Sequence, residues 1–261
     1  MPNLPISCFI IACNEADRIA RTIASVRDWV DEVIVIDSGS TDATQRIATE
    51  AGARVLFNAW PGFGQQKRFG EMQCRRDWLL NLDADEVVPP ALAAEIAALF
   101  EVGPPPCAVY GCDVADVYPG AELPRPFARD HYCLRLYDRR RARFKDSTLF
   151  DSVDPGREPV GHLVHAMHHF SIRSLAHLSA KCDARATYNA ANAKPRSRAA
   201  LALRLPIEFP LSFFKVYVWR RHFTGGLIGF HYARIIATYR FLRIWRMLVS
   251  ARRSPAAGSA P

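Results

Sequence analysis

The sequence of 261 residues lacks the features that mark several common classes of protein. No uncharged apolar run approaches the roughly 18 residues that a membrane-spanning helix needs. The first residues also lack the basic stretch, apolar core and small-residue cleavage site of a secretory signal. The seven cysteines include no Cys-x-x-Cys pair and are odd in number, and several fall in strand-like runs. These observations predict reduced, buried thiols in a cytoplasmic protein.

Acidic residues are almost missing from residues 194–253, which hold 13 Lys and Arg against Glu208 alone. Such a basic segment predicts an anionic partner. Nucleic acid is not expected, because no recognised nucleic-acid-binding module is present. Arg240, Arg243 and Arg246 would share one face of a helix, opposite a face containing Phe and Trp. This pattern favours a helix lying on a membrane surface over one packed on the rest of the chain with its arginines in solvent.

Glycine-rich phosphate loops are missing as well. The first strand-like run, residues 6–12, leads into Cys13-Asn14-Glu15 without a Gly-x-Gly-x-x-Gly segment. This excludes a dinucleotide-dependent dehydrogenase and disfavours a sugar nucleotidyltransferase. The five histidines between residues 162 and 177 are accompanied by neither a cysteine pair nor a His-Glu-x-x-His helix, so a zinc site is not expected.

Strand-like and helix-like runs alternate through the first hundred residues, joined by short polar turns. This alternation predicts an α/β fold with a mostly parallel sheet flanked by helices. The expected strands are residues 6–12, 32–37, 54–57, 78–83, 107–114 and 132–138. The expected helices are one carrying Ile19, Ile23, Val26 and Val30, then residues 43–51 and 65–76, one beginning near Pro90, and residues 174–193 before a break at Pro195.

Acidic residues follow or close three of these strands: Glu15, Asp37 and Asp83, with Asp85 two residues further on. Ligands of open α/β sheets bind beyond the carboxyl ends of the strands. Two carboxylates in one turn can share a Mg²⁺ or Mn²⁺ ion that also holds substrate phosphates. The alternative for Asp83 and Asp85 is a solvated turn before a helix N-terminus.

Three motifs occur together, in an order and spacing that resemble the family 2 inverting glycosyltransferases of GT-A fold, closest to the bacterial lipopolysaccharide-core β-glucosyltransferase branch. The motifs are Ile10-Ile11-Ala12-Cys13-Asn14-Glu15, Val35-Ile36-Asp37-Ser38-Gly39-Ser40-Thr41-Asp42 and Leu82-Asp83-Ala84-Asp85-Glu86. Two further segments resemble that branch: residues 60–67, and residues 169–171 together with Lys181 and Tyr188. The resemblance spans roughly residues 5–250.

The resemblance implies a nucleotide-sugar donor, a divalent cation and a role for each matching residue. Asn14, Glu15 and Asp37 are implied to bind the donor, the two acids through its uridine and ribose. Gln66 and Lys67 are implied to lie near the base or diphosphate of a UDP-sugar. Asp83 is implied to contact the ribose or the metal, Asp85 to be the main Mg²⁺ or Mn²⁺ ligand, and His169 to complete the metal shell, with a structural role as its alternative.

The catalytic base is the point at which this sequence departs from the family pattern. Relatives often carry Val-His-Glu, and residues 149–153, Leu-Phe-Asp-Ser-Val, align with it here. The alignment makes Asp151 the candidate base, with Asp154 and then Asp146 as alternatives. Inversion needs one base within hydrogen-bond reach of the attacking hydroxyl.

The resemblance thus implies a metal-dependent hexosyltransferase, moving glucose from UDP-glucose to a lipopolysaccharide-core or other lipid-linked acceptor. It would act peripherally on the cytoplasmic face of the bacterial inner membrane. The expected domains are residues 1–193, divided into a nucleotide-sugar half (1–103) and an acceptor half (104–193), a basic helical extension (194–253) and a disordered tail (254–261). A non-catalytic scaffold is the alternative that the altered base motif leaves open.

Overall fold

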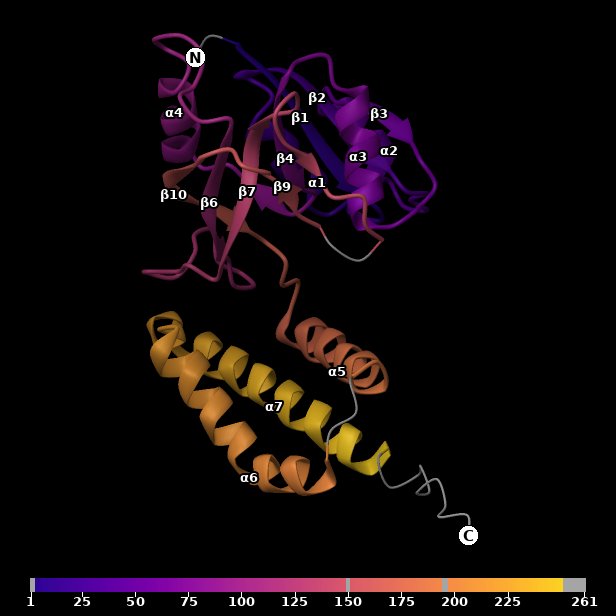
Figure 1. Cartoon of the computed structure of the whole chain (residues 1–261), viewed down its shortest axis with the longest axis vertical. Coiled ribbons are helices and arrows are strands. Elements are labelled where there is room, and N and C mark those ends of the chain that lie inside the picture. Colours follow the sequence, from indigo (N-terminus) through magenta and orange to yellow (C-terminus); the bar gives the residue numbers. More distant parts are fainter. Residues whose placement is uncertain (1–2, 149–150, 194–196, 251–261) are drawn as a thin grey trace. The chain divides into compact units, whose positions relative to one another are not determined.

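The computed structural model describes residues 3–148, 151–193 and 197–250 (Figure 1). The chain forms two compact units. The sheet unit comprises the chain up to Asp116 together with Arg129–Ser171, and the helical unit comprises Val117–Ala128 and the chain from Ile172 onward. This division differs from the expected boundary at residue 193, because the helix before that residue packs on the C-terminal helix. The predicted break at Pro195, the residues aligned at 149–150 and the predicted tail at 254–261 lie outside the described residues.

The sheet unit alternates strands and helices along its first hundred residues, as the sequence predicted. Its elements are β1 (Leu4–Ala12), α1 (Ile19–Ala24), β2 (Val30–Asp37), α2 (Thr44–Glu50), β3 (Arg54–Phe57), α3 (Phe63–Gln73), β4 (Trp78–Asp83), β5 (Glu86–Val87), α4 (Pro90–Ala98), β6 (Val109–Asp116), β7 (His131–Asp138), β8 (Arg143–Phe144), β9 (Val153–Asp154) and β10 (Val160–His169). Two expectations were wrong. The first helix ends at Ala24, so that Val30 begins β2, and the histidine-rich residues 160–169 form a strand that the sequence did not predict.

An eight-stranded sheet has the order β3-β2-β1-β4-β7-β6-β10-β5. β1 pairs in parallel with β2 and β4, β2 with β3, and β6 with β10. β7 runs antiparallel to both of its neighbours, and β5 runs antiparallel to β10. The predicted α/β class, a mostly parallel sheet flanked by helices, is therefore confirmed.

Both faces of the sheet are covered, which explains why the central strands are apolar without alternation. Ile6 and Ile10 of β1 pack in one buried cluster with residues of α1, α2 and α4. Phe9, on the opposite face, packs in a second cluster with Leu79 and Phe144, and that face is covered by α3 and the β8–β9 hairpin. Two packed faces hold the strand ends, and hence the residues that follow them, in fixed register.

The helical unit consists of α5 (Leu175–Ala191), α6 (Arg198–Phe214), the π-helical turn η1 (Lys215–Trp219), the 3₁₀ turn η2 (His222–Gly225) and α7 (Gly226–Ser250). Both α5 and α6 pack against α7 (Figure 1). Glu208 of α6 is buried and bridges Arg204 (Nε–Oε2 2.6 Å) and Arg240 of α7 (Nε–Oε1 2.8 Å). Within the described residues, none of the helices has the length and apolarity to cross a membrane.

Part of the surface of α7 that was predicted to be interfacial makes contacts inside this unit. Ile244 and Met247 are buried with Leu201. Arg240 is bound to Glu208, and Arg246 to Asp183 of α5 at 2.6 Å. Two of the three arginines predicted to share that face, Arg240 and Arg246, therefore pair with carboxylates that α6 and α5 supply, and contact of the helix with a membrane stays a prediction.

The cysteines match their prediction in part. All seven lie within the described residues, and none forms a disulfide. Cys8 of β1, Cys112 of β6 and Cys74, which directly follows α3, are buried. Cys13 is exposed, because it follows the last residue of β1 in the connection toward α1.

Candidate active site

The parallel register brings polar residues from several strands to one edge of the sheet. Asp83 at the end of β4 stands opposite Ile11, and Asp37 at the end of β2 stands opposite Ala12. At the other side of β7, Asp116 at the end of β6 stands opposite His169 at the end of β10. These are carboxyl ends of parallel strands, the edge at which α/β sheets bind ligands.

A buried lysine joins two of the predicted site residues. Lys67 of α3 is fully buried, and its Nζ lies 2.9 Å from Asp83 Oδ1 and 2.9 Å from Asp151 Oδ1. Arg135 of β7 approaches the other oxygen of Asp83 (Nη2–Oδ2 3.0 Å) and reaches Glu86 Oε1 at 2.5 Å. Asp83 and Asp151 are therefore held on either side of one ammonium group, although 68 residues of chain separate them.

These contacts determine the charges of the group. Burial opposes ionisation of Asp83, but Lys67 and Arg135 outweigh it and hold the pKa of that carboxyl well below its usual range. Burial likewise opposes the charge on Lys67, yet Asp83 and Asp151 raise its pKa above the ordinary value. Glu86 differs, because burial raises its pKa in spite of Arg135. Asp83, which is partly exposed, and the buried Lys67 therefore form an ionised pair, in which loss of the carboxylate would remove one of the two partners of the lysine's buried charge.

Asp85 is held by a second set of partners. Arg18 Nη1 lies 3.2 Å from Asp85 Oδ2, and the same arginine donates through Nε to Glu15 Oε2 at 2.9 Å. His169 Nε2 lies 3.4 Å from Asp85 Oδ1, while its Nδ1 lies 2.8 Å from Asp116 Oδ1. Burial raises the pKa of Asp85, but His169 and Arg18 outweigh it and lower the pKa overall.

Neighbouring carboxylates stabilise the protonated form of His169. Burial favours the neutral imidazole, but hydrogen bonds to Asp116 and Asp85 raise the pKa of His169 to about 10. An imidazolium has no free lone pair for a metal ion, so His169 acts here as the cationic partner of Asp85. Its predicted role as a metal ligand requires the loss of that proton.

The donor set fits a magnesium-like ion held chiefly by carboxylates. Within the described residues, no group of three or more His, Cys, Asp and Glu side chains has the arrangement of a metal site. Mg²⁺ commonly takes only one or two protein carboxylates and completes its shell with water and substrate phosphates. Asp85, whose side chain is 17% exposed, offers such a carboxylate, with Asp83 as the neighbouring candidate. Each carboxylate already faces two cationic side chains, Asp83 those of Lys67 and Arg135 and Asp85 those of Arg18 and His169, so their contacts do not rank one above the other as a metal ligand.

The first two strand-end loops are bound to each other. Asn14 has a positive φ of 57°, and its Oδ1 accepts from the backbone of Thr41 at 2.9 Å. The backbone N–H of Glu15 donates to Thr44 Oγ1 at 2.8 Å. Asp37 is fully buried and accepts from the backbone of Gly39 and Ser40, both at 2.9 Å. Asp37 therefore shapes this loop, and its contact with a nucleotide stays a prediction.

Gln66 is also turned toward protein groups. Its side chain is fully buried, accepts from Asn58 Nδ2 at 2.6 Å and donates to Ser38 Oγ at 3.2 Å. Gln66 thereby ties α3 to the loops after β2 and β3. Neither Gln66 nor Lys67 has exposed surface, and their contact with a donor stays a prediction.

The three candidate bases lie in different surroundings. Asp151 contacts Lys67. Asp154 of β9 stands opposite Arg143 of β8 and accepts from the backbone of Gly156 at 3.0 Å. Asp154 and Asp146 both line a separate hollow of about 460 Å³ rimmed by basic side chains, which are Arg68, Arg139, Arg140, Arg141, Arg143 and Lys145. Of the three, Asp151 is the one joined to the strand-end carboxylates.

Four members of this site had no role in the sequence prediction: Arg18, Glu86, Asp116 and Arg135. Arg135 carried a usable signal, because a single arginine interrupts the apolar run of a predicted strand and needs a buried acidic partner. Glu86 was visible as the third acid of its motif. Asp116 lay beyond the predicted strand end at residue 114, and Arg18 offered only its spacing from Glu15. We call these four residues, with Glu15, Lys67, Asp83, Asp85, Asp151 and His169, the strand-end cluster.

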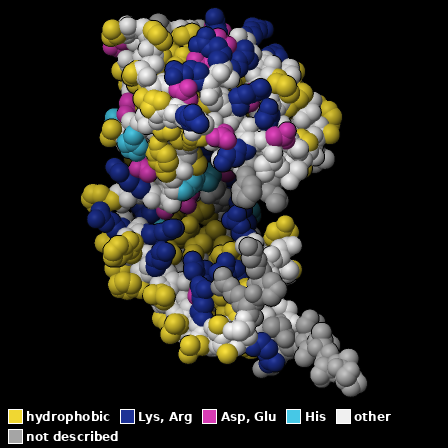
Figure 2. All heavy atoms as spheres, in the orientation of Figure 1, with side chains coloured by type: hydrophobic (Ala, Val, Ile, Leu, Met, Phe, Trp, Pro, Cys, Tyr) yellow, Lys and Arg dark blue, Asp and Glu magenta, His cyan; other side chains and the backbone are white. Residues whose placement is uncertain are grey.

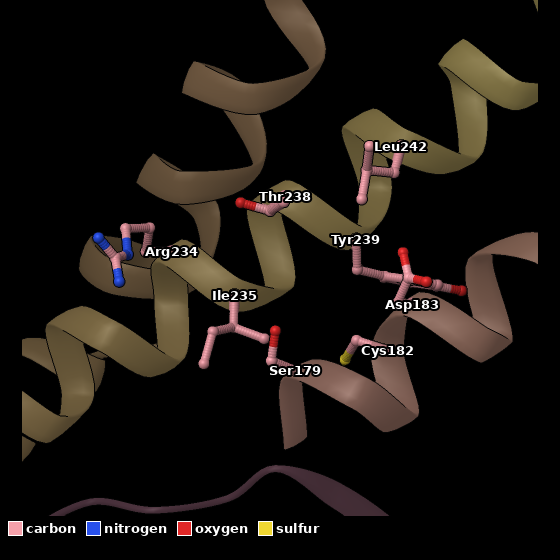
Figure 3. Close-up of a pocket in the computed structure, with 8 residues that line it drawn as sticks. All are labelled: Ser179, Cys182, Asp183, Arg234, Ile235, Thr238, Tyr239 and Leu242. Carbon is pink, nitrogen blue, oxygen red and sulfur yellow. The ribbon is translucent and has the colours of Figure 1, made fainter. Parts of the chain in front are cut away.

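A second cavity, of about 390 Å³, lies inside the helical unit between α5 and α7 (Figure 3). Arg234, Thr238 and Tyr239 line it from α7, and Ser179 and Cys182 from α5. None of its lining residues belongs to the strand-end cluster or to the predicted site. The cavity is therefore distinct in composition from the site at the sheet edge.

Comparisons with known proteins agree with the sequence motifs. The family model described as Glycosyl transferase family 2 matches residues 7–157. An uncharacterized glycosyltransferase of Rickettsia felis is 37% identical over 258 residues, covering 95% of this chain and 91% of that protein. The lipopolysaccharide core biosynthesis glycosyltransferase LpsC of Rhizobium meliloti is 29% identical and covers 93% of this chain and 91% of its own.

A solved structure is also similar to this chain. It is the glucosyl-3-phosphoglycerate synthase of Mycobacterium tuberculosis in complex with Mn²⁺, UDP and glucosyl-3-phosphoglycerate. Its TM-score is 0.41 at 20% sequence identity, and the match covers 74% of this chain and 81% of that one.

Proposed function

This chain belongs to glycosyl transferase family 2, and we propose that it transfers glucose from UDP-glucose, with inversion, to a lipopolysaccharide-core or similar lipid-linked acceptor. Glycosyl transfer is what the family does. The sugar, the nucleotide, the acceptor and the need for a metal ion are the proposal. The observation that carries it is the strand-end cluster, in which the metal-binding and base candidates converge at one sheet edge.

The cluster offers the two functions that inversion needs. A hydroxyl of the acceptor attacks the anomeric carbon, the bond from that carbon to the diphosphate oxygen breaks, and the hydroxyl proton passes to a base. Asp151 is the proposed base, since its carboxylate is paired with Lys67 and its side chain is 31% exposed. Lys67 holds Asp151 and Asp83 at equal distances of 2.9 Å, so the base side and the donor side share one positioning group.

Asp85 is the proposed ligand of the divalent cation. Carboxylates outnumber cationic side chains in the strand-end cluster, which favours the binding of an added cation. Arg18 and His169 orient Asp85, and Asp116 orients His169 through its Nδ1. When bound, Mg²⁺ or Mn²⁺ would neutralise the charge that develops on the departing diphosphate.

The acceptor and the location are proposed from similarity and charge together. LpsC is named for lipopolysaccharide core biosynthesis, which supports an acceptor of that class. The 13 Lys and Arg of residues 194–253, against one acid, support attachment to an anionic surface, here the cytoplasmic face of the inner membrane. A lipid-linked acceptor would be met at that surface.

Calorimetric titration with UDP-glucose in the presence of Mn²⁺ tests the donor site. We expect wild-type protein to bind only when Mn²⁺ is present, and Asp85→Asn to lose most of that binding. Asp28→Asn is the matched control, because Asp28 is 80% exposed and contacts only Arg27 among the ion pairs of the described residues. Failure of folded wild-type protein to bind any uridine nucleotide would overturn the proposal. Binding without transfer to any acceptor would instead favour the non-catalytic scaffold.

A further inference from the structure

One face of α6 exposes a continuous row of large apolar side chains. Leu203, Ile207, Leu211 and Phe214 of α6, continued by Val218 of η1, recur at intervals of three or four residues and are each between 42% and 79% exposed. We call this row the α6 stripe. Figure 2 shows hydrophobic side chains gathered along the flank of the helical unit where Figure 1 places α6. Single exposed apolar residues are ordinary, but a row of them along one helix indicates an interaction surface.

The packing of α6 explains why this face is turned outward. Leu201, Glu208 and Ser212 are buried on the opposite side of the helix. Arg204 and Arg240 of α7 hold Glu208 on that side by hydrogen bonds to its carboxylate. Rotating the helix to bury the stripe would break this buried ion pair, which is costly when one partner is left alone. The buried ion pair of Glu208 therefore keeps the stripe exposed in the folded helical unit.

Charge is almost missing from this helix. In residues 199–214, all of them described, the only charged side chains are Arg204 and Glu208, and they pair with each other. The solvent-facing side of a surface helix ordinarily carries charged and polar residues. This one carries Pro206 and Pro210 beside the stripe instead. Exposure of this face of α6 to water is therefore unfavourable.

Basic and aromatic residues follow the stripe at its C-terminal end. Lys215, Arg220 and Arg221 are exposed, and Trp219 among them is 79% exposed. Leu227 at the start of α7 is 76% exposed. An apolar face bordered by Trp and by Lys or Arg is the composition of helices that lie in the interface of a membrane, and Lys and Arg there favour anionic lipids. No acidic side chain other than the buried Glu208 offsets these charges in residues 194–253.

We propose that the α6 stripe docks on an anionic lipid surface together with Trp219 and the nearby cations Lys215, Arg220 and Arg221. The helix lies on that surface and does not cross it, since the described helices are too polar or too short to span a bilayer. The inference rests on the membrane location in the proposed function and moves the lipid contact from the arginine face of α7 to the apolar face of α6.

Sedimentation with lipid vesicles tests this surface in the full-length protein. The probes are vesicles of phosphatidylglycerol with phosphatidylethanolamine, compared with phosphatidylcholine alone. We expect wild type to bind the anionic vesicles. Ile207→Glu with Leu211→Glu should lower the partition coefficient on the order of tenfold or more, because two apolar side chains that docking would bury in the lipid are lost. Ile207→Ala with Leu211→Ala should weaken binding without adding charge.

The control must add the same charge at exposed apolar positions elsewhere. Val102→Glu with Val164→Glu does so in the sheet unit, where both side chains are exposed, and should bind vesicles like wild type. Circular dichroism and UDP binding check that every variant is folded. If wild-type protein fails to bind UDP, that result counts against the proposed function alone, because vesicle binding is measured separately.

Two results would overturn the docking proposal. One is wild-type protein that does not sediment with anionic vesicles, or stripe variants that sediment as the control does. The other is a wild-type dimer in analytical ultracentrifugation that the stripe variants dissociate while their vesicle binding is unchanged, which would make a second copy of the chain the occupant of the stripe.

Discussion

Lys67 links the two halves of the strand-end cluster. Its ammonium is buried, retains its charge and contacts one carboxylate from β4 and one from the segment before β9. Phe144 lies beneath it, with the lysine Nζ 5.2 Å from the ring centroid. A buried ammonium with two carboxylates has little freedom to move, so Asp151 is positioned in advance of any acceptor. This arrangement distinguishes Asp151 from the other acids of the same segment.

Asp151→Ala is expected to lower kcat about 10²–10⁴-fold, the usual contribution of a positioned general base. Binding of UDP-glucose should change little, since Asp151 is proposed to act on the acceptor. Steady-state kinetics, combined with calorimetric titration of the donor, would measure the two effects separately.

Asp154→Ala is the matched comparison, because it removes an acid three residues away that lines the basic hollow. Its kcat should stay near that of wild type. If Asp154→Ala loses activity and Asp151→Ala retains it, the assignment of the base reverses. Equal loss in both variants would point to a shared structural effect, which the unfolding temperatures would reveal.

At the scale of elements, one buried acid links α6 to α7 beside their apolar contacts. Burial raises the pKa of Glu208, but hydrogen bonds from Arg204 and Arg240 outweigh it and lower the pKa overall. A carboxyl whose folded pKa lies below its unfolded value, about 4.3 for Glu, stabilises the fold above that value. This stability is lost as the pH falls through the folded pKa.

Glu208→Gln should therefore reduce the free energy of unfolding at pH 7 by about 1.5–3 kcal/mol, the range for hydrogen bonds to a charged group. The difference from wild type should shrink as the pH falls below about 4. Urea unfolding at pH 7 and at pH 3.5 measures both. Glu50→Gln is the control, because Glu50 forms an exposed pair with Arg46 on α2 and should show little effect at either pH.

At the scale of the whole molecule, the proposed reaction has a stereochemical signature. A single displacement turns an α-configured donor into a β-linked product, and removal of the divalent cation should abolish the transfer. Incubation with UDP-glucose, Mn²⁺ and a truncated lipopolysaccharide-core acceptor, followed by NMR of the anomeric proton, would establish the configuration. An α-linked product would contradict inversion. Full activity after exhaustive EDTA treatment would contradict metal dependence.

Some of the architecture could be read from local pattern. The alternation of apolar runs with helical spacing predicted the strands from β1 to β4 and the class of the sheet. β10 was missed because its histidines alternate with apolar residues only in part, and because several of them face solvent or other polar groups. The short α1 was overestimated, since Val30 continues the helical spacing of Ile19, Ile23 and Val26 although it belongs to β2.

The sequence by itself determined which strands end in acids, because strand ends and motifs are local. It did not determine which distant residues meet those acids. Arg18 reaches Asp85 across 67 residues, Arg135 reaches Asp83 across 52, and His169 reaches Asp116 across 53. These contacts follow from the strand order β1-β4-β7-β6-β10. That order is set by the packing of the whole sheet and produces no periodic pattern in the sequence. The outward face of α6 was decided in the same way, by the buried bridge from Glu208 to α7.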